Sequence, residues 1–125
     1  MQKSILLDVN AEPELVFDVL SDLKNYPLWL SFIQKVENTD IHESWMVTLR
    51  SQIGPFSRLK KLRMRRTLSP STRSVLFHRD EVDGKDHSNW LLRVRIDEIQ
   101  STQCLITLEL EYSGKCWSKT LENIL

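Results

Sequence analysis

The sequence has little of the chemistry that marks disulfide-rich, metal-binding or redox proteins. Its 125 residues include only two cysteines and three histidines, and their spacing matches no metal-ligand pattern. Two cysteines are also too few for a disulfide framework, so we expect reduced thiols and a cytoplasmic location. Neither a metal site nor another cofactor is predicted.

Long apolar runs and an excess of one charge are missing too. No run approaches the roughly 20 apolar residues that span a bilayer, and the N-terminus, MQKSILLDV, lacks the apolar segment of a signal peptide. Lysine plus arginine and aspartate plus glutamate number 17 each, so the formal net charge is zero. A net charge of zero gives no overall electrostatic field that would attract the chain to nucleic acid or to an anionic membrane. Local charged patches are still compatible with it.

Catalytic motifs are absent as well. The chain carries no nucleophile elbow, phosphate-binding loop or dinucleotide fingerprint. Its histidines fall near expected turns and strand ends, and Cys104 has no sequence neighbour that would lower its thiol pKa. The adjacent carboxylates Asp80-Glu81 and Asp97-Glu98 point in different directions on an extended backbone. No catalytic residue is predicted.

What the chain does contain is the composition of a globular domain. Hydrophobic residues make up 41% and charged residues 27%, close to the averages for soluble globular proteins. A chain of this length can bury one hydrophobic core but not two. Without repeats or a linker-like composition shift, we expect a single domain over residues 1–125.

The N-terminal stretch predicts one strand followed by helix. Ser4–Val9 is a short apolar run typical of a strand. Pro13 suits the first turn of a helix, where its missing N–H has no partner to lose. Val16, Phe17 and Leu20 then share one helical face, which predicts an amphipathic helix.

A second short helix is expected directly afterwards. Asp22 can cap it, so that it begins at Leu23. Pro27 disfavours helical geometry in the residue before it, which predicts that this helix ends at Tyr26.

From Phe32 onward the pattern becomes β-like, with turn signals at regular intervals. Gly54-Pro55 separates two strands, Asp83-Gly84 indicates a tight hairpin, Gly114 closes the last strand, and Ser69-Pro70-Ser71 supplies another turn. The expected strands are Phe32–Asn38, Ser44–Ser51, Arg58–Leu68, Arg73–Arg79, Ser88–Ile96 and Gln103–Tyr112.

The last residues predict a helix. Within Cys116–Leu125, one helical face collects Trp117, Leu121, Ile124 and Leu125. The order is therefore strand, two helices, six strands and helix. It predicts an α+β fold with a mostly antiparallel sheet and its helices on one side.

These features together resemble the START-like superfamily, which includes polyketide cyclases, coenzyme Q-binding proteins and lipid-transfer domains. The matching residues are the strand Ser4–Val9, Ala11-x-Pro13, Val16-Phe17, Leu20, Asp22 and Tyr26-Pro27-x-Trp29. The resemblance implies a helix-grip fold, in which a curved antiparallel sheet of about seven strands surrounds a C-terminal helix. It also implies a chamber for a hydrophobic ligand.

Two details refine the resemblance. Ile53-Gly54-Pro55-Phe56 and Tyr112-x-Gly114-Lys115 resemble the carbon monoxide dehydrogenase G-type branch of the superfamily. The C-terminal helix has room for only about ten residues, or about 15 Å, whereas helices in the family are usually about twice as long. Either the chamber is less covered here, or a partner closes it.

The segment Arg58–Leu68, RLKKLRMRRTL, is strongly basic and invites comparison with nucleic-acid binding. With a period of two, however, Lys61, Arg63 and Arg65 share one face, which reads as an ordinary solvated surface. Glu109 and Glu111 on the last strand offset other arginines in the sheet, and aromatic residues for base stacking are missing from the basic segment. We predict no nucleic-acid partner.

Arg66 is the exception within that segment. Its parity places it on the apolar face with Leu62 and Met64. A buried, unpaired guanidinium is very costly. Three arrangements satisfy it: a position at the sheet rim from which it reaches water, an acidic partner, or a polar ligand head group.

The predicted ligand chamber lies between the sheet and the C-terminal helix. Its tryptophans suit aromatic or isoprenoid ligands, although each alone is compatible with an ordinary core position. The expected ligand-binding residues are Trp45, Met64, Arg66, Phe77, Trp90, Leu92, Leu108, Trp117 and Leu121. The predicted function is binding of a hydrophobic small molecule such as a lipid, polyketide or isoprenoid. A cyclase or dehydratase, and a protein-interaction module with an open apolar groove, are the alternatives.

Overall fold

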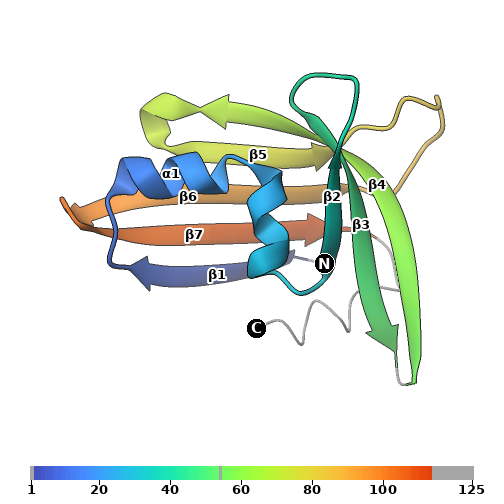
Figure 1. The fold of residues 1–125 in the computed structure, drawn as a ribbon, viewed down its shortest axis with the longest axis horizontal. Helices are drawn as coiled ribbons and strands as arrows, with labels where there is room; N and C mark the ends of the chain where they lie inside the picture. Colours follow the sequence, from blue (N-terminus) through green and yellow to red (C-terminus); the bar gives the residue numbers. More distant parts are fainter. Residues whose placement is uncertain (1, 54, 114–125) are drawn as a thin grey trace.

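The computed structural model describes residues 2–53 and 55–113. Their strands form one curved, seven-stranded antiparallel sheet (Figure 1). The strand order across the sheet is β1-β7-β6-β5-β4-β3-β2. The elements along the chain are β1 (Gln2–Val9), α1 (Pro13–Leu20), the 3-10 helix η1 (Leu23–Leu28), β2 (Ile33–Asn38), β3 (Ser44–Ile53), β4 (Phe56–Ser69), the 3-10 turn η2 (Pro70–Thr72), β5 (Ser74–Arg79), β6 (Trp90–Gln100) and β7 (Gln103–Tyr112).

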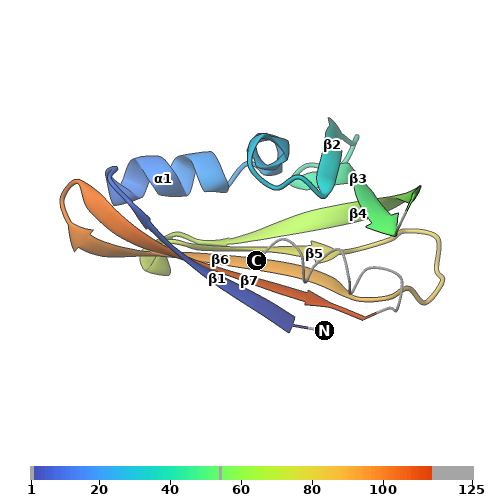
Figure 2. The same cartoon turned by 90° about the horizontal axis from the view of Figure 1, so that it is seen from below.

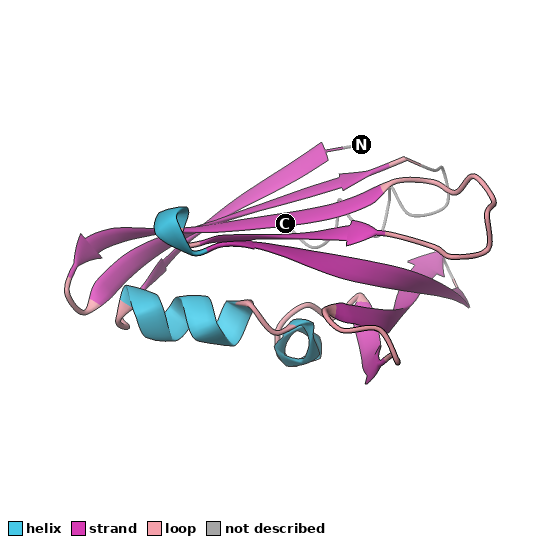
Figure 3. Ribbon diagram, turned by 90° about the horizontal axis from the view of Figure 1, so that it is seen from above, coloured by secondary structure: helices cyan, strands magenta, loops and turns pink. Residues whose placement is uncertain are grey.

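The predicted α+β class is confirmed, and each predicted strand is present. Gln103–Tyr112 has the predicted bounds, and the other strands differ by a few residues at one or both ends. Figures 2 and 3 show that α1 and η1 lie on the same face of the sheet. The predicted C-terminal helix, with Trp117 and Leu121, and the predicted turn at Gly114 lie outside the described residues.

Helix α1 forms where the sequence predicts it. Pro13 occupies its first turn, and Val16, Phe17 and Leu20 are all buried against the sheet. The helix ends at Ser21, whose backbone N–H and hydroxyl both donate to the Phe17 carbonyl, at 2.9 and 2.6 Å. The apolar face thus fixes how α1 lies on the sheet.

The second helix begins as predicted but ends later. The Asp22 carboxylate accepts a hydrogen bond from the Lys24 N–H at 3.0 Å, so this cap is confirmed. The predicted end at Tyr26 is wrong, because η1 continues through Pro27 to Leu28. In such a short 3-10 turn a proline removes only one hydrogen bond. The turn then closes at Tyr26, whose carbonyl accepts from the two amides after Leu28, at 3.1 and 2.8 Å.

The connection between β5 and β6 is longer than predicted. These strands are antiparallel neighbours, and Gly84 has the expected positive φ of 72°. A tight Asp83-Gly84 hairpin is nevertheless wrong, since the loop spans residues 80–89. After β5, the Asp80 N–H donates to the Arg63 carbonyl at 2.9 Å, and the Glu81 carboxylate accepts from the Arg63 N–H, also at 2.9 Å. Both contacts hold residues 80 and 81 against β4. The chain therefore follows β4 after the end of β5 and needs a long loop to reach the start of β6.

Aromatic side chains form the centre of the core. Tyr26 and Phe77 are fully buried, with ring centroids 5.4 Å apart in an edge-to-face arrangement. Phe77 meets Trp45 in the same manner at 5.9 Å. The Tyr26 hydroxyl donates to the Leu20 carbonyl at 2.7 Å, and burial raises the pKa of this phenol far above its ordinary value. Tyr26 therefore joins η1 to the end of α1 as a neutral group.

The outer face of the sheet carries paired charges. Arg93 lies directly opposite Glu109 in the β6–β7 register, and the two form an ion pair at 3.2 Å. Arg65 pairs with Asp80 at 3.3 Å. These pairs are exposed, so each adds at most about 1 kcal/mol to stability. The predicted compensation of sheet arginines by acidic neighbours is confirmed for these two.

Candidate ligand-binding site

An apolar hollow of about 350 Å³ lies between α1, β1, β7 and the end of η1, and we call it the α1 groove. It is open to solvent on one side. Its lining is entirely apolar and consists of Leu7, Ala11, Leu15, Val16, Val19, Leu20, Trp29 and Ile106.

The groove exists because α1 has more apolar surface than the sheet covers. Leu15 and Val19 are one helical turn apart, and they remain 58% and 47% exposed. On the sheet side, Leu7 of β1 lies beside Ile106 of β7 in the strand register. The next residue back, Leu6, points to the opposite face and is 65% exposed.

Sequence reasoning missed this groove. It used Val16, Phe17 and Leu20 to define the apolar face of α1 and gave no role to Leu15 or Val19. The signal that could have found the groove is that second apolar pair at helical spacing.

A second and much smaller space, the inner cavity, lies between η1, β2 and the sheet. It measures about 20 Å³, which is room for about one water molecule. Its lining consists of Leu23, Phe32, Ile33, Val47, Leu49, Leu62, Met64, Trp90, Leu92 and Leu110.

The structure brings some of the predicted site residues together and separates others. Met64, Trp90 and Leu92 line the inner cavity. Phe77 and Leu108 are buried on the same face of the sheet but do not line either space. Their binding role stays a prediction.

Arg66 and Trp45 form a separate cluster beside Phe77. One Arg66 Nη donates to Glu43 Oε1 at 3.0 Å, and the other donates to the Ser21 carbonyl at 2.8 Å. The guanidinium carbon lies 5.5 Å from the centre of the Trp45 ring, within the range of a cation–π contact. Of the three arrangements considered for Arg66, the acidic partner is the one observed. A ligand head group would have to compete with Glu43.

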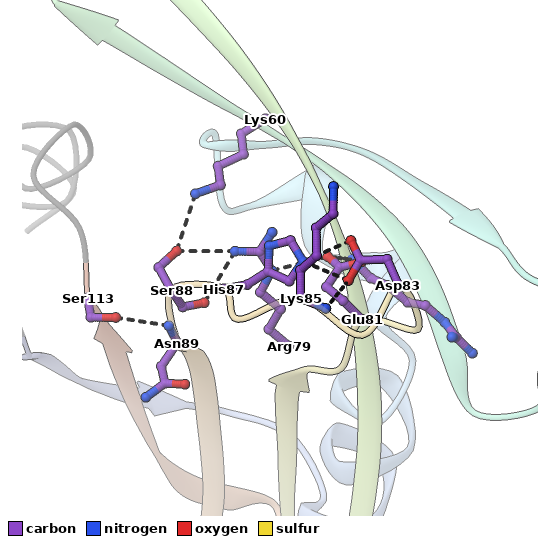
Figure 4. A network of polar contacts seen from close by, with 10 residues as sticks. Lys60, Arg79, Glu81, Asp83, Lys85, His87, Ser88, Asn89 and Ser113 are labelled. Atoms are coloured by element: carbon purple, nitrogen blue, oxygen red, sulfur yellow. Dashed lines mark hydrogen bonds and ion pairs between the residues drawn. The ribbon is translucent and has the colours of Figure 1, made fainter.

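A network of polar contacts borders the inner cavity at the end formed by residues 80–89 (Figure 4). Arg79 lies beside Met64 in the β4–β5 register, and its side chain is only 9% exposed. Its Nε donates to Glu81 Oε1 at 3.1 Å, and Nη1 donates to the Ser88 carbonyl and hydroxyl at 3.2 and 3.1 Å. The Lys60 Nζ reaches the same hydroxyl at 3.3 Å. The network therefore lies next to the cavity, but none of its residues lines it.

Sequence reasoning also missed Arg79. The parity rule that singled out Arg66 applies equally to Arg79, which continues the buried positions Val75 and Phe77 at a spacing of two.

The loop beyond this network carries an exposed acid–histidine pair. Asp83 lies 2.9 Å from the Nε2 atom of His87. The Lys85 backbone N–H, and then the His87 ring, hold the pKa of Asp83 below its usual range. Both residues are exposed, so the pair holds the loop together and does not face either space.

Other reactive chemistry is limited in the described part of the chain. Burial raises the pKa of the Cys104 thiol, which makes it a poor nucleophile. No three His, Cys, Asp or Glu side chains within residues 2–53 and 55–113 gather as metal ligands. In the same residues, no helix has the length and apolar character needed to cross a membrane.

The family model described as polyketide cyclase / dehydrase and lipid transport matches residues 9–121. The chain belongs to this family. Its sheet topology is that of the START-like helix-grip fold, so the predicted fold and superfamily are confirmed. No curated protein is a significant match to the chain.

Several solved structures share the fold at low identity. The Zhui aromatase/cyclase from a Streptomyces species is 18% identical, with a TM-score of 0.67 over 96% of this chain and 72% of that one. A Deinococcus radiodurans protein is 14% identical, with a TM-score of 0.71 over 99% and 90%. A START superfamily protein from Mycobacterium smegmatis is 18% identical, with a TM-score of 0.63 over 98% and 85%. The narrower resemblance to the carbon monoxide dehydrogenase G-type branch stays a prediction.

Proposed function

We propose that this protein binds a hydrophobic small molecule, of the lipid, polyketide or isoprenoid class, on the face of the sheet that carries α1. The observation that carries the proposal is the α1 groove, an apolar hollow of about 350 Å³ in a member of a lipid-transport and cyclase family. Small-molecule sites usually measure roughly 300–1,000 Å³ and are mostly apolar.

The groove also suits this ligand class energetically. Its lining includes four side chains that are partly exposed, namely Leu7, Leu15, Val19 and Trp29. An apolar ligand would remove their surface from water, which contributes about 25 cal/mol per Å² of apolar area. The inner cavity, at about 20 Å³, would hold a ligand only after η1 and β2 moved away from the sheet.

Binding is favoured over catalysis by the chemistry of the lining. The Zhui neighbour is an aromatase/cyclase, and catalysis of that kind needs titratable groups in contact with substrate. The residues that line the α1 groove include no titratable side chain. The inward-facing cations Arg66 and Arg79 do not line the groove either, and they are engaged with Glu43 and Glu81.

The proposal is tested by a pair of variants on one strand. Leu7→Glu places a carboxylate in the groove, and the control Leu6→Glu places the same charge on the opposite face of β1. Titration with the neutral probe N-phenyl-1-naphthylamine should show at least a tenfold loss of affinity for Leu7→Glu and little change for Leu6→Glu, since burying an unpaired charge is costly. Equal affinity in the two variants would exclude the α1 groove as the site.

A further inference from the structure

The β3–β4 hairpin extends beyond the rest of the sheet (Figure 1). β2 pairs with β3 only as far as Leu49, and β5 pairs with β4 only from Met64 onward. Residues 50–53 therefore pair as strands only with residues 56–59, while Lys60 and Lys61 continue β4 opposite Leu49 and Thr48. We call residues 50–53 and 56–61 the β3–β4 arm. A two-stranded ribbon on its own is marginally stable in water, so a projecting one is a candidate for contact with another surface.

The arm concentrates positive charge in a chain whose net charge is zero. Its basic residues are Arg50, Arg58, Lys60 and Lys61, and no acidic residue occurs between positions 50 and 61. Arg50 and Lys61 form no ion pair with any residue in the described ranges. The outer-face arginines of β6 differ, since they are paired with acids.

Exposed apolar side chains accompany these charges. Phe56, at the end of the arm, is 74% exposed, and Leu59 is 63% exposed. They are three residues apart, or roughly 10 Å along a strand. Amphipathic segments insert about 5–10 Å into the boundary between head groups and acyl chains, so both side chains are within reach of that layer.

We propose that the β3–β4 arm docks end-on onto an anionic membrane surface. Phe56 and Leu59 enter the head-group boundary, while Arg50 and Lys61 contact the anionic head groups around them. This docking is independent of the ligand site, because the arm shares no residue with the α1 groove.

The distribution of charge favours a membrane over nucleic acid. Strand alternation puts Arg50 and Lys61 on one face of the ribbon. Along that face β4 continues into Arg63, which is buried, and Arg65, which is paired with Asp80. The basic face is therefore short, whereas a phosphate backbone is met by one continuous basic face. A phenylalanine at the end of the ribbon also matches insertion better than stacking along a strand of bases.

The test is sedimentation of the whole protein with vesicles. Vesicles of phosphatidylcholine alone are compared with vesicles containing about 30% phosphatidylserine, at about 0.1 M and about 0.5 M NaCl. The arm variant is Arg50→Gln/Lys61→Gln. The control is Arg93→Gln/Arg95→Gln, which removes the same net charge from the outer face of β6. A second pair compares Phe56→Ser with Leu28→Ser, since Leu28 is 86% exposed on η1, away from the arm.

Wild type should bind the anionic vesicles, and this binding should weaken at high salt. It should bind neutral vesicles poorly. Each lost cation should weaken binding about fivefold, so the arm variant should lose about 25-fold while its charge control stays near wild type. Phe56→Ser should lose about tenfold, and Leu28→Ser should not.

Three results would overturn the proposal. The first is that wild type does not bind anionic vesicles. The second is that the arm variant and its charge control lose the same amount of vesicle affinity. The third is that wild type binds a 20-base-pair duplex more tightly than it binds vesicles at the same salt concentration. Thermal melts check that the variants fold. Phe56→Ser keeps the test valid if the double variant does not fold, because unchanged vesicle binding by Phe56→Ser would also refute end-on insertion.

Discussion

Replacing Arg66 by methionine should destabilise the protein by about 2–3 kcal/mol. Its charged hydrogen bond to the Ser21 carbonyl contributes about 1.5–3 kcal/mol, because that carbonyl belongs to a buried residue and loses its donor. The contact with Trp45 adds about 0.5–1 kcal/mol. The ion pair with Glu43 adds less than about 1 kcal/mol, since Glu43 is 40% exposed. Methionine returns about 1 kcal/mol through its own apolar burial.

The assay is urea unfolding followed by circular dichroism and tryptophan fluorescence. The matched control is Arg65→Met, the same substitution one position earlier, where the side chain is 53% exposed on the outer face. That change should cost less than about 1 kcal/mol. The midpoint of thermal unfolding should fall by about 8–12 °C for Arg66→Met. A loss for Arg65→Met as large as that for Arg66→Met would refute the reasoning, because it would show that burial and the Ser21 contact do not set the cost.

Three further outcomes are expected. Gly84→Val should cost about 1–2 kcal/mol in urea unfolding, and Gly84→Asn clearly less, because a Cβ there meets no atom within 4 Å and the whole cost is the positive φ. Glu81→Ala should speed hydrogen exchange of the Arg63 amide, whose acceptor it removes, whereas Glu81→Gln should preserve protection; equal exchange in both would contradict the role given to that carboxylate. Asp83 has a lowered folded-state pKa, so it stabilises the protein above its unfolded pKa and this contribution is lost as the pH falls. The difference in urea midpoint between wild type and Asp83→Asn should therefore shrink from about pH 6 towards about pH 3, and a constant difference would contradict it.

The fold was predictable because each strand carries its own signal. Alternation in β4 separates Leu62 and Met64 from Lys61 and Arg65, and the structure places the two sets on opposite faces. The predicted solvent exposure is wrong for Arg63, which is only 7% exposed. The same rule put Arg66 on the inner face, where it meets an acid. Local pattern fixes such positions because a one-residue shift in register would turn Leu62 and Met64 outward and Lys61 and Arg65 inward.

One error arises where a tertiary contact overrides a local signal, and the other where a short 3-10 helix tolerates a proline. Asp83-Gly84 is a strong hairpin pair, but the Glu81 carboxylate binds Arg63 on β4 and lengthens the loop. Pro27 does not end η1, because the Tyr26 carbonyl accepts the closing hydrogen bonds. The Glu81–Arg63 contact has no sequence signal, because only the fold brings these two residues together.

The position of the candidate site was less predictable than the fold for a related reason. Periodicity identifies which side chains point inward, but not how much space is left between them. Met64, Trp90 and Leu92 do point inward, yet they enclose only about 20 Å³. The α1 groove depends on where α1 packs across the sheet, and periodicity does not give that position.

The arrangement of inward cations bears on what kind of ligand the protein can select. Arg66 and Arg79 each face the interior, and each is held by a carboxylate, Glu43 or Glu81, and by a carbonyl oxygen. A ligand head group would gain a charged hydrogen bond, of roughly 1.5–3 kcal/mol, only by giving up one of similar strength. Exchange of that kind adds little affinity, whereas apolar area in the α1 groove adds affinity without breaking any contact. Selection should therefore follow the shape and apolar area of the ligand more than its head group. In probe-displacement titrations, Arg66→Met should change the affinity for a fatty acid and the affinity for its methyl ester to the same extent. A selective loss of the free acid would show instead that Arg66 leaves Glu43 to bind the ligand.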